Sequence, residues 1–177
     1  VMVANGSKGT FSGSGSVYTL VVIPTAGAQG NITVDVSTTG VTDSAGNQAT
    51  TPAQVTQAFD TIAPTVTITD NISGVANAAV VSFTFSFSES VTGFDASKVS
   101  VGNGSKGTFS GSGRVYRLVV IPAADVQGNI TVDVSTTGVS DAAGNQATAP
   151  AQYTQAINTL ALVATEPSYA APSTNPF

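Results

Sequence analysis

The residues of this chain that could do chemistry are carboxylates and carboxamides, because the sequence contains neither histidine nor cysteine. Their absence removes the commonest general bases, nucleophiles and thiolate metal ligands. Paired carboxylates can cleave glycosidic bonds, but such pairs flank a substrate cleft, whereas most acids here fall singly in turns or on the outer faces of expected strands. We therefore predict that the chain is not an enzyme and has no catalytic residues.

Asp, Glu and Asn side chains suit another task, which is the binding of calcium through oxygen ligands. Five candidate ligands lie in expected connections of the complete repeat: Asp60, Glu89, Asp95, Asp141 and Asn145. Two more, Asp43 and Asn47, lie in a loop nearer the N-terminus that has the same sequence pattern as the loop of Asp141 and Asn145. Turn chemistry explains the same residues, because Asp and Asn cap backbone amides in loops. The spacing is not that of a consecutive-ligand loop, and Asn158 replaces Asp60 at the next boundary. Calcium and turn capping both stay open, and capping is the simpler interpretation.

An internal repeat organises the chain. Residues 1–60 align without gaps to residues 99–158, at an offset of 98, and 47 of the 60 positions are identical. The period is domain-sized, far beyond the roughly 20–45 residues of a solenoid unit. We predict the C-terminal part of one repeat at 1–60, lacking its first two strands, and a complete repeat at 61–158. A Pro/Ser-rich tail or linker follows at 159–177, and its start, Leu160–Ala164, could form a short strand.

Regularly spaced strand signals predict an all-β fold, an immunoglobulin-like sandwich of about seven antiparallel strands, in tandem. Val80–Ser88 alternates strictly between apolar and hydroxyl side chains, as a strand with one face in a core does. Asn103-Gly104 predicts a tight hairpin between the third and fourth strands. The seven expected strands are Thr65–Asp70, Val80–Ser88, Lys98–Gly102, Gly107–Gly111, Val115–Ile121, Asn129–Ser135 and Ala151–Ile157. The expected core residues are Phe83, Phe85, Phe87, Tyr116, Leu118, Ile130, Val132 and Tyr153.

The alternating direction of these strands predicts which candidate ligands can meet. If the first strand runs away from the junction with the preceding repeat, every second connection returns to that junction. Glu89 and Asp95 follow the second strand, and Asp141 and Asn145 follow the sixth. Together with the linker residue Asp60 they are expected to gather at the N-terminal end of the complete repeat.

Charge and hydropathy exclude two classes of partner. The net charge of −5 and the pI of about 4.2 argue against nucleic acid, whose recognition needs a basic surface. No uninterrupted apolar run approaches the roughly 20 residues of a membrane helix. The absence of cysteine is compatible with secretion, because a chain of this size buries a sizeable core without disulfides.

The order and spacing of several motifs resemble the bacterial immunoglobulin-like repeats of large surface adhesins and biofilm proteins. These motifs are FDTIAPTVTI (Phe59–Ile68), FSESVTGFDASKVSVGNG (Phe87–Gly104), YRLVVIPA and GNITVDVSTTGVSDAAGNQA, and the resemblance covers residues 1–158. It implies an extended extracellular stalk at the bacterial cell surface, with calcium often stiffening domain junctions and with neighbouring repeats as partners.

Two functions follow from the repeat and the resemblance. The first is a structural, non-catalytic stalk segment, because a spacer needs many similar rigid units. The second is a subunit of a self-assembling extracellular fibre, in which strands of a neighbouring copy, the tail among them, complete residues 1–60. Arbitrary boundaries of a longer repeat protein explain the incomplete first repeat more simply than donor strands do. A carbohydrate-binding module is disfavoured by the absence of tryptophan.

Overall fold

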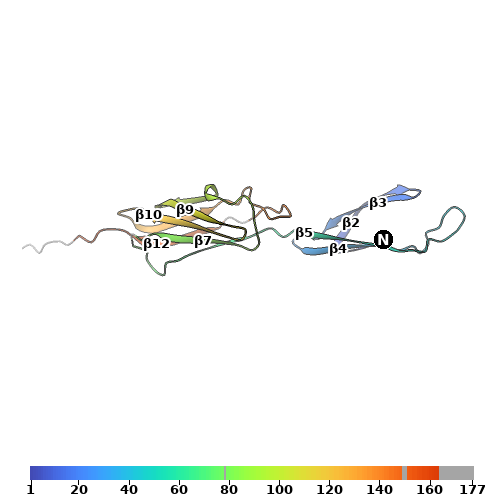
Figure 1. Ribbon diagram of the computed structural model, residues 1–177, viewed down its shortest axis with the longest axis horizontal. Helices are drawn as coiled ribbons and strands as arrows, with labels where there is room; N and C mark the ends of the chain where they lie inside the picture. Colours follow the sequence, from blue (N-terminus) through green and yellow to red (C-terminus); the bar gives the residue numbers. More distant parts are fainter. Residues whose placement is uncertain (78, 149–150, 164–177) are drawn as a thin grey trace, which may run out of the picture.

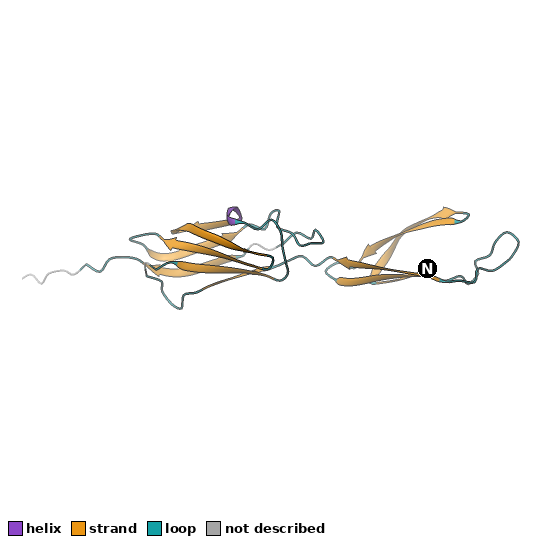
Figure 2. Ribbon diagram, in the orientation of Figure 1, coloured by secondary structure: helices purple, strands orange, loops and turns teal. Residues whose placement is uncertain are grey.

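The computed structural model describes residues 1–77, 79–148 and 151–163, which form antiparallel strands joined by turns and a short 3-10 helix (Figure 2). The all-β prediction is confirmed. The strands lie in two groups, one from residues 1–60 and one from residues 66–158, which follow each other along an elongated molecule (Figure 1). The elements are β1 (Met2–Ala4), β2 (Gly6–Ser14), β3 (Val17–Pro24), β4 (Gln29–Val36), β5 (Ala53–Asp60), β6 (Val66–Asp70), β7 (Val81–Phe87), η1 (Ala96–Lys98), β8 (Val99–Gly102), β9 (Gly104–Ser112), β10 (Val115–Pro122), β11 (Gln127–Val134) and β12 (Gln152–Asn158).

Strands β6 to β12 form a sandwich of two sheets. One sheet has the order β6-β7-β10-β9 and the other the order β12-β11-β8, with antiparallel neighbours throughout. A four-stranded sheet against a three-stranded one is the arrangement of a constant-type immunoglobulin domain. Each of the expected strands overlaps one of these strands, so the immunoglobulin-like prediction is confirmed.

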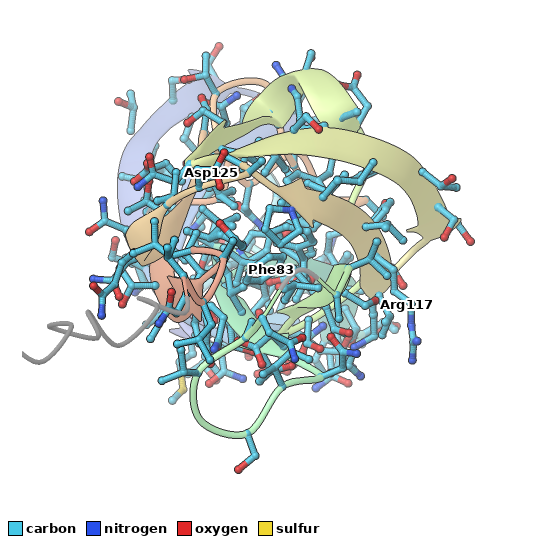
Figure 3. All side chains as sticks on the ribbon, turned by 90° about the vertical axis from the view of Figure 1, so that its left-hand side faces the viewer. Phe83, Arg117 and Asp125 are labelled. Carbon is cyan, nitrogen blue, oxygen red and sulfur yellow. The ribbon has the colours of Figure 1, made fainter. Side chains whose placement is uncertain are left out.

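Strand β7 lies at the centre of the core because its side chains alternate strictly between the two faces. Val81, Phe83 and Phe85 are fully buried and Phe87 nearly so, while the hydroxyl side chains between them are partly exposed. Figure 3 shows Phe83 inside the sandwich. All but one of the expected core residues are buried; Tyr153 is partly exposed and lies edge-on to Phe83, with ring centroids 6.0 Å apart.

The connection between β7 and β8 contributes core residues that the sequence analysis missed. Val91 and Phe94 are buried there although they belong to no strand. The Phe94 ring lies edge-on to Phe85, Phe87 and Tyr116, at centroid distances of 5.4, 5.0 and 5.0 Å. Such edge-to-face contacts stabilise a core beyond the apolar area that they bury.

The hairpin predicted at Asn103-Gly104 is wrong. Strand β8 pairs with β11 and strand β9 pairs with β10, so the chain passes here from one sheet to the other. Asn103 makes the corner with a φ of 54°, and its side-chain amide donates to the carbonyl of Asn129, 2.8 Å away. The sequence correctly indicated a positive φ at this position, but asparagine is favoured both in hairpin turns and in corners at which the chain crosses between sheets. The strand suggested at the start of the tail is also not observed, since residues 160–163 lie in no strand.

Residues 1–60 repeat the last five strands of the sandwich without its first two. Strands β1, β4 and β5 form one sheet, and β2 and β3 form another. Figure 1 shows the β2–β3 ribbon diverging from β4 and β5. Their inner face is exposed: Tyr18 is 57% exposed, whereas the equivalent Tyr116 of the sandwich is 6% exposed.

Candidate metal centre at the junction

Three carboxylates meet where β5 ends and the sandwich begins. Asp60 is the last residue of β5, Glu89 follows the end of β7, and Asp141 opens the turn between β11 and β12. One carboxylate oxygen of each lies within 4.8 Å of the others. The alternation of strand direction thus brings together side chains that are far apart in the sequence. Asp60 and Glu89 are partly exposed, whereas Asp141 is only 5% exposed.

The turn that carries Asp141 is fixed by its own hydrogen bonds. The Asp141 carboxylate accepts from the backbone N–H of Asn145 at 2.9 Å and from its side-chain amide at 2.8 Å. Gly144 turns the chain with a φ of 92°. The Asn145 amide also donates to the backbone carbonyl of Asp60 at 3.2 Å, which links the turn to the end of β5. These hydrogen bonds orient the Asp141 carboxylate within the turn.

The charges at this cluster repel one another. Burial raises the pKa of Glu89, and the neighbouring carboxylates of Asp141 and Asp60 raise it further. Burial would also raise the pKa of Asp141, but the hydrogen bonds from Asn145 and from the backbone of Ala143 and Gly144 together outweigh that effect and leave its pKa lowered. Arg114 offsets this negative charge in part. An all-oxygen donor set with net negative charge fits a hard cation such as calcium. The residues present therefore fit the metal that the sequence suggests.

The other candidate ligands lie elsewhere. Asp95 is not part of the three-carboxylate group; it caps η1, and its carboxylate accepts from the backbone N–H of Ser97 at 2.7 Å. A hydrogen bond from the Ser97 hydroxyl, together with that backbone bond, lowers the pKa of Asp95. Asp43 and Asn47 form a turn with the same bonds as Asp141 and Asn145, but no other acid of the described residues completes a three-carboxylate group there.

A family model described as a bacterial Ig-like domain matches residues 60–159. The chain belongs to the bacterial Ig-like domain family. Searches among curated proteins and among solved structures found no match. Proteins of the Ig-like family are typically non-catalytic structural domains, which agrees with a chain that has neither histidine nor cysteine. Within the residues described for this Ig-like chain, no helix is long and apolar enough to span a membrane.

Replacing Glu89 by glutamine is expected to stabilise the Ig-like domain at neutral pH in the presence of a chelator. The raised pKa means that ionisation of Glu89 opposes folding; its contribution to stability is present below the ordinary carboxyl range and is lost as the pH rises through the raised pKa. Glu89→Gln should raise the melting temperature by a few degrees at pH 7 and leave it nearly unchanged near pH 3. Calorimetry at both pH values checks this, and a lower melting temperature at pH 7 would contradict it.

Proposed function

We propose that the chain is a stiff, non-catalytic spacer segment of an extracellular bacterial repeat protein of the adhesin or biofilm type. The observation that carries the proposal is a very short linker, held at both ends, between β5 and β6. A spacer transmits distance and force only when its joints resist bending, so the joint is the part of the molecule on which this function depends.

The upstream end of the linker is fastened to the first group of strands by Thr61. Its backbone N–H donates to the carbonyl of Ala28 at 2.9 Å, and its hydroxyl donates to the carbonyl of Thr25 at 2.7 Å. The same hydroxyl accepts from the N–H of Ala28 at 3.0 Å. Thr159 makes the equivalent bonds after β12, so the fastening belongs to the repeat rather than to one junction.

The downstream end of the linker is fastened to the sandwich. Pro64 is fully buried, and Thr65 exchanges hydrogen bonds with Ser88, donating from its N–H to the Ser88 hydroxyl at 3.0 Å. Ile62 is also restrained, because its N–H donates to the Asp60 carboxylate at 2.9 Å. Ala63 remains as the residue with the fewest restraints. A linker of this kind gives the two groups of strands little freedom to rotate, because proline and paired backbone groups limit the torsion angles available.

Calcium would strengthen the same joint. Asp60 belongs to the end of β5, whereas Glu89 and Asp141 belong to the sandwich. A cation held by all three would replace their mutual repulsion by attraction and would tie the linker to the sandwich. The bond from Asn145 to the Asp60 carbonyl already joins the two sides, so the joint is expected to be stiff without calcium and stiffer with it.

Distance measurements between spin labels test the spacer function. The chain has no cysteine, so Ser12→Cys and Ser110→Cys place one label on each exposed hairpin. We expect a narrow distance distribution in the parent chain and a clearly broader one in Pro64→Gly, because glycine restores torsional freedom at the buried end of the linker. Pro52→Gly, in an exposed loop outside the linker, is the control and should leave the distribution narrow. A broad distribution in the parent chain would refute the stiff spacer.

A second candidate function is a subunit of a self-assembling fibre in which strands of a neighbouring copy would complete residues 1–60. The tail proposed as the donor strand falls largely on residues 164–177, outside the described residues. Of its described part, Leu162 and Val163 are exposed and contact no sheet as a strand.

A further inference from the structure

Several asparagines of the chain begin the pattern Asn-X-Ser/Thr, which marks an acceptor for N-linked sugars. They are Asn5, Asn31, Asn71, Asn103 and Asn129. The pattern also arises by chance in a chain rich in serine and threonine, so it counts only where the folded protein presents the side-chain amide to an enzyme. The structure separates these asparagines on this criterion.

The side chains of Asn5, Asn71 and Asn103 are engaged within the protein. The amide of Asn5 donates to the carbonyl of Asn31 at 2.8 Å, and the amide of Asn103 donates to the carbonyl of Asn129 at 2.8 Å. The side-chain oxygen of Asn71 accepts from the backbone N–H of the first residue but one of β7, at 2.7 Å. These side chains serve the fold, and an enzyme would have to break their bonds to turn the amides into its active site.

The side chains of Asn31 and Asn129 point away from the core. Each is exposed and is followed by a buried isoleucine, Ile32 or Ile130. Because successive residues of a strand face opposite sides, the threonine two positions after each asparagine lies on the same outer face. The bonds from the two corner asparagines end on the backbone of these residues and leave their side-chain amides unbound within the described residues. The amide and the hydroxyl that the pattern requires are therefore presented together.

The neighbouring strands leave room beside both acceptor side chains. Asn31 pairs with Ala58 on β5, and Asn129 pairs with Ala156 on β12. On the other side, the pairing of β1 with β4 and of β8 with β11 comes no closer than two residues from each asparagine, because the chain turns away to the other sheet. Cross-strand neighbours on one face lie about 5 Å apart and would crowd a sugar. Here one neighbour contributes only a methyl group.

A shallow groove of about 570 Å³ lies beside Asn31 at the junction with the sandwich. Its lining includes Gln29 and Asp60 from the first group of strands and Glu89 and Ser90 from the sandwich. Carboxylates, carboxamides and hydroxyls are groups that hydrogen-bond to sugar hydroxyls. The groove has the size of a small-ligand site, so it accommodates the first sugar of a glycan on Asn31.

The surface of the chain has few charges for a folded protein in water. Charged residues make up 8% of the sequence, against about 25% in typical soluble domains. Net charge keeps dissolved chains apart, and a hydrated sugar does so by occupying the space around the surface. Asn31 lies in the sheet β1-β4-β5 and Asn129 in the equivalent sheet β12-β11-β8. Sugars at these positions would therefore recur along the chain with the period of the repeat.

We propose that Asn31 and Asn129 are acceptors for N-linked sugars, supplied by an activated donor in which C1 of the sugar is bonded to a phosphate oxygen. The side-chain nitrogen forms a bond to C1 as the bond between C1 and that oxygen breaks. The phosphate leaves with the bonding electrons, and a base of the transferase takes up the proton lost by the amide. No oxidant or reductant takes part. The proposal does not rest on the spacer function, whose test measures distances between labels.

Glycosylation of the folded chain tests whether the structure selects these sites. The probe is UDP-glucose with a soluble N-glycosyltransferase specific for Asn-X-Ser/Thr. We expect the full chain to take up glucose at Asn31 and Asn129 roughly tenfold faster than at Asn5, Asn71 and Asn103, because hydrogen bonds must open first at those three. Synthetic peptides of the same patterns should lack this preference. Peptide mapping with electron-transfer fragmentation measures each site, and equal rates at all sites of the folded chain overturn the proposal.

Two variants of Thr131 provide the matched comparison. Thr131→Val keeps the shape of the side chain and removes the hydroxyl that the pattern requires, so modification of Asn129 should be lost while Asn31 is still modified. Thr131→Ser keeps the hydroxyl and should keep the modification of Asn129. Undiminished modification of Asn129 in Thr131→Val would mean that the pattern is not read there, which contradicts the proposal.

The protein purified from the bacterium that makes it decides whether the sites are used. The same peptide mapping should find sugar on Asn31 and Asn129 and none on Asn5, Asn71 or Asn103. Bare asparagine at both acceptor positions overturns the proposal, even where the transferase modifies the purified chain. Sugar on the engaged asparagines instead overturns it as well, because the structure would then not have selected the sites.

Discussion

Replacing Phe85 by alanine is expected to lower the free energy of unfolding of the sandwich by about 3–5 kcal/mol, a large fraction of the stability of a single domain. Phe85 is fully buried on the central strand β7. It lies opposite Tyr116 on one side and Ile68 on the other, and its ring contacts Phe94. The surrounding side chains come from both strands and a loop, so they cannot all move into the cavity that alanine leaves.

Phe11→Ala is the matched control for this prediction, because it makes the same substitution at an exposed position of residues 1–60. It is expected to change the unfolding free energy of the sandwich by less than about 0.5 kcal/mol. Urea unfolding followed by tyrosine fluorescence and by circular dichroism measures both variants. A loss below about 1 kcal/mol for Phe85→Ala would mean that the core does not depend on β7 as the structure indicates.

The fold could be predicted from the sequence in those segments where apolar and polar side chains alternate regularly. The strict alternation of Val80–Ser88 gave both the strand and its buried face, because a strand directs successive side chains to opposite sides. Phe94 was missed because it lies in a connection, where no period marks an inward residue. Asn103 was assigned to a hairpin because a positive φ identifies a turn but not the strands that the turn joins.

The sequence predicted at which end of the sandwich the candidate ligands lie, but not which of them come close enough to share one ion. Strand direction placed Asp60, Glu89 and Asp141 at one end of the sandwich, and the structure brings them together. The same reasoning placed Asp95 at that end, but Asp95 precedes η1 and binds the amide of Ser97 instead. Counting strands gives the end at which a connection lies; only the path of the connection shows where each side chain points.

Equivalent residues of the two repeats also differ in burial, and the sequence of one repeat by itself does not show this difference. Tyr18 and Tyr116 hold the same position in equivalent strands of the two repeats, yet Tyr18 is exposed and Tyr116 is buried. The difference comes from β6 and β7, which precede the second copy and cover it. Burial is therefore a property of the complete sandwich, and each repeat depends on its first two strands to bury the last five.

Calcium is expected to raise the melting temperature of the chain, because a ligand that binds the folded protein alone stabilises it by about 2.7 kcal/mol at a hundredfold excess over its dissociation constant. The unfolded chain has no site, since Asp60, Glu89 and Asp141 meet only when β5, β7 and β11 are in place. The relief of repulsion at Glu89 contributes to the affinity for calcium on which this stabilisation depends. Scanning calorimetry in calcium and in chelator measures the shift, which should grow with the free calcium concentration.

Asp141→Asn is expected to abolish this calcium response, because it removes the buried carboxylate of the group. Asp43→Asn is its matched control. Asp43 opens a turn with the same hydrogen bonds from Asn47, so its replacement disturbs an equivalent turn. It lies outside the three-carboxylate group, so the calcium response should be kept. Identical melting curves of the parent chain in calcium and in chelator would leave Asp141 with the capping role alone, and a loss of the response in Asp43→Asn would place the ion at the turn rather than at the junction.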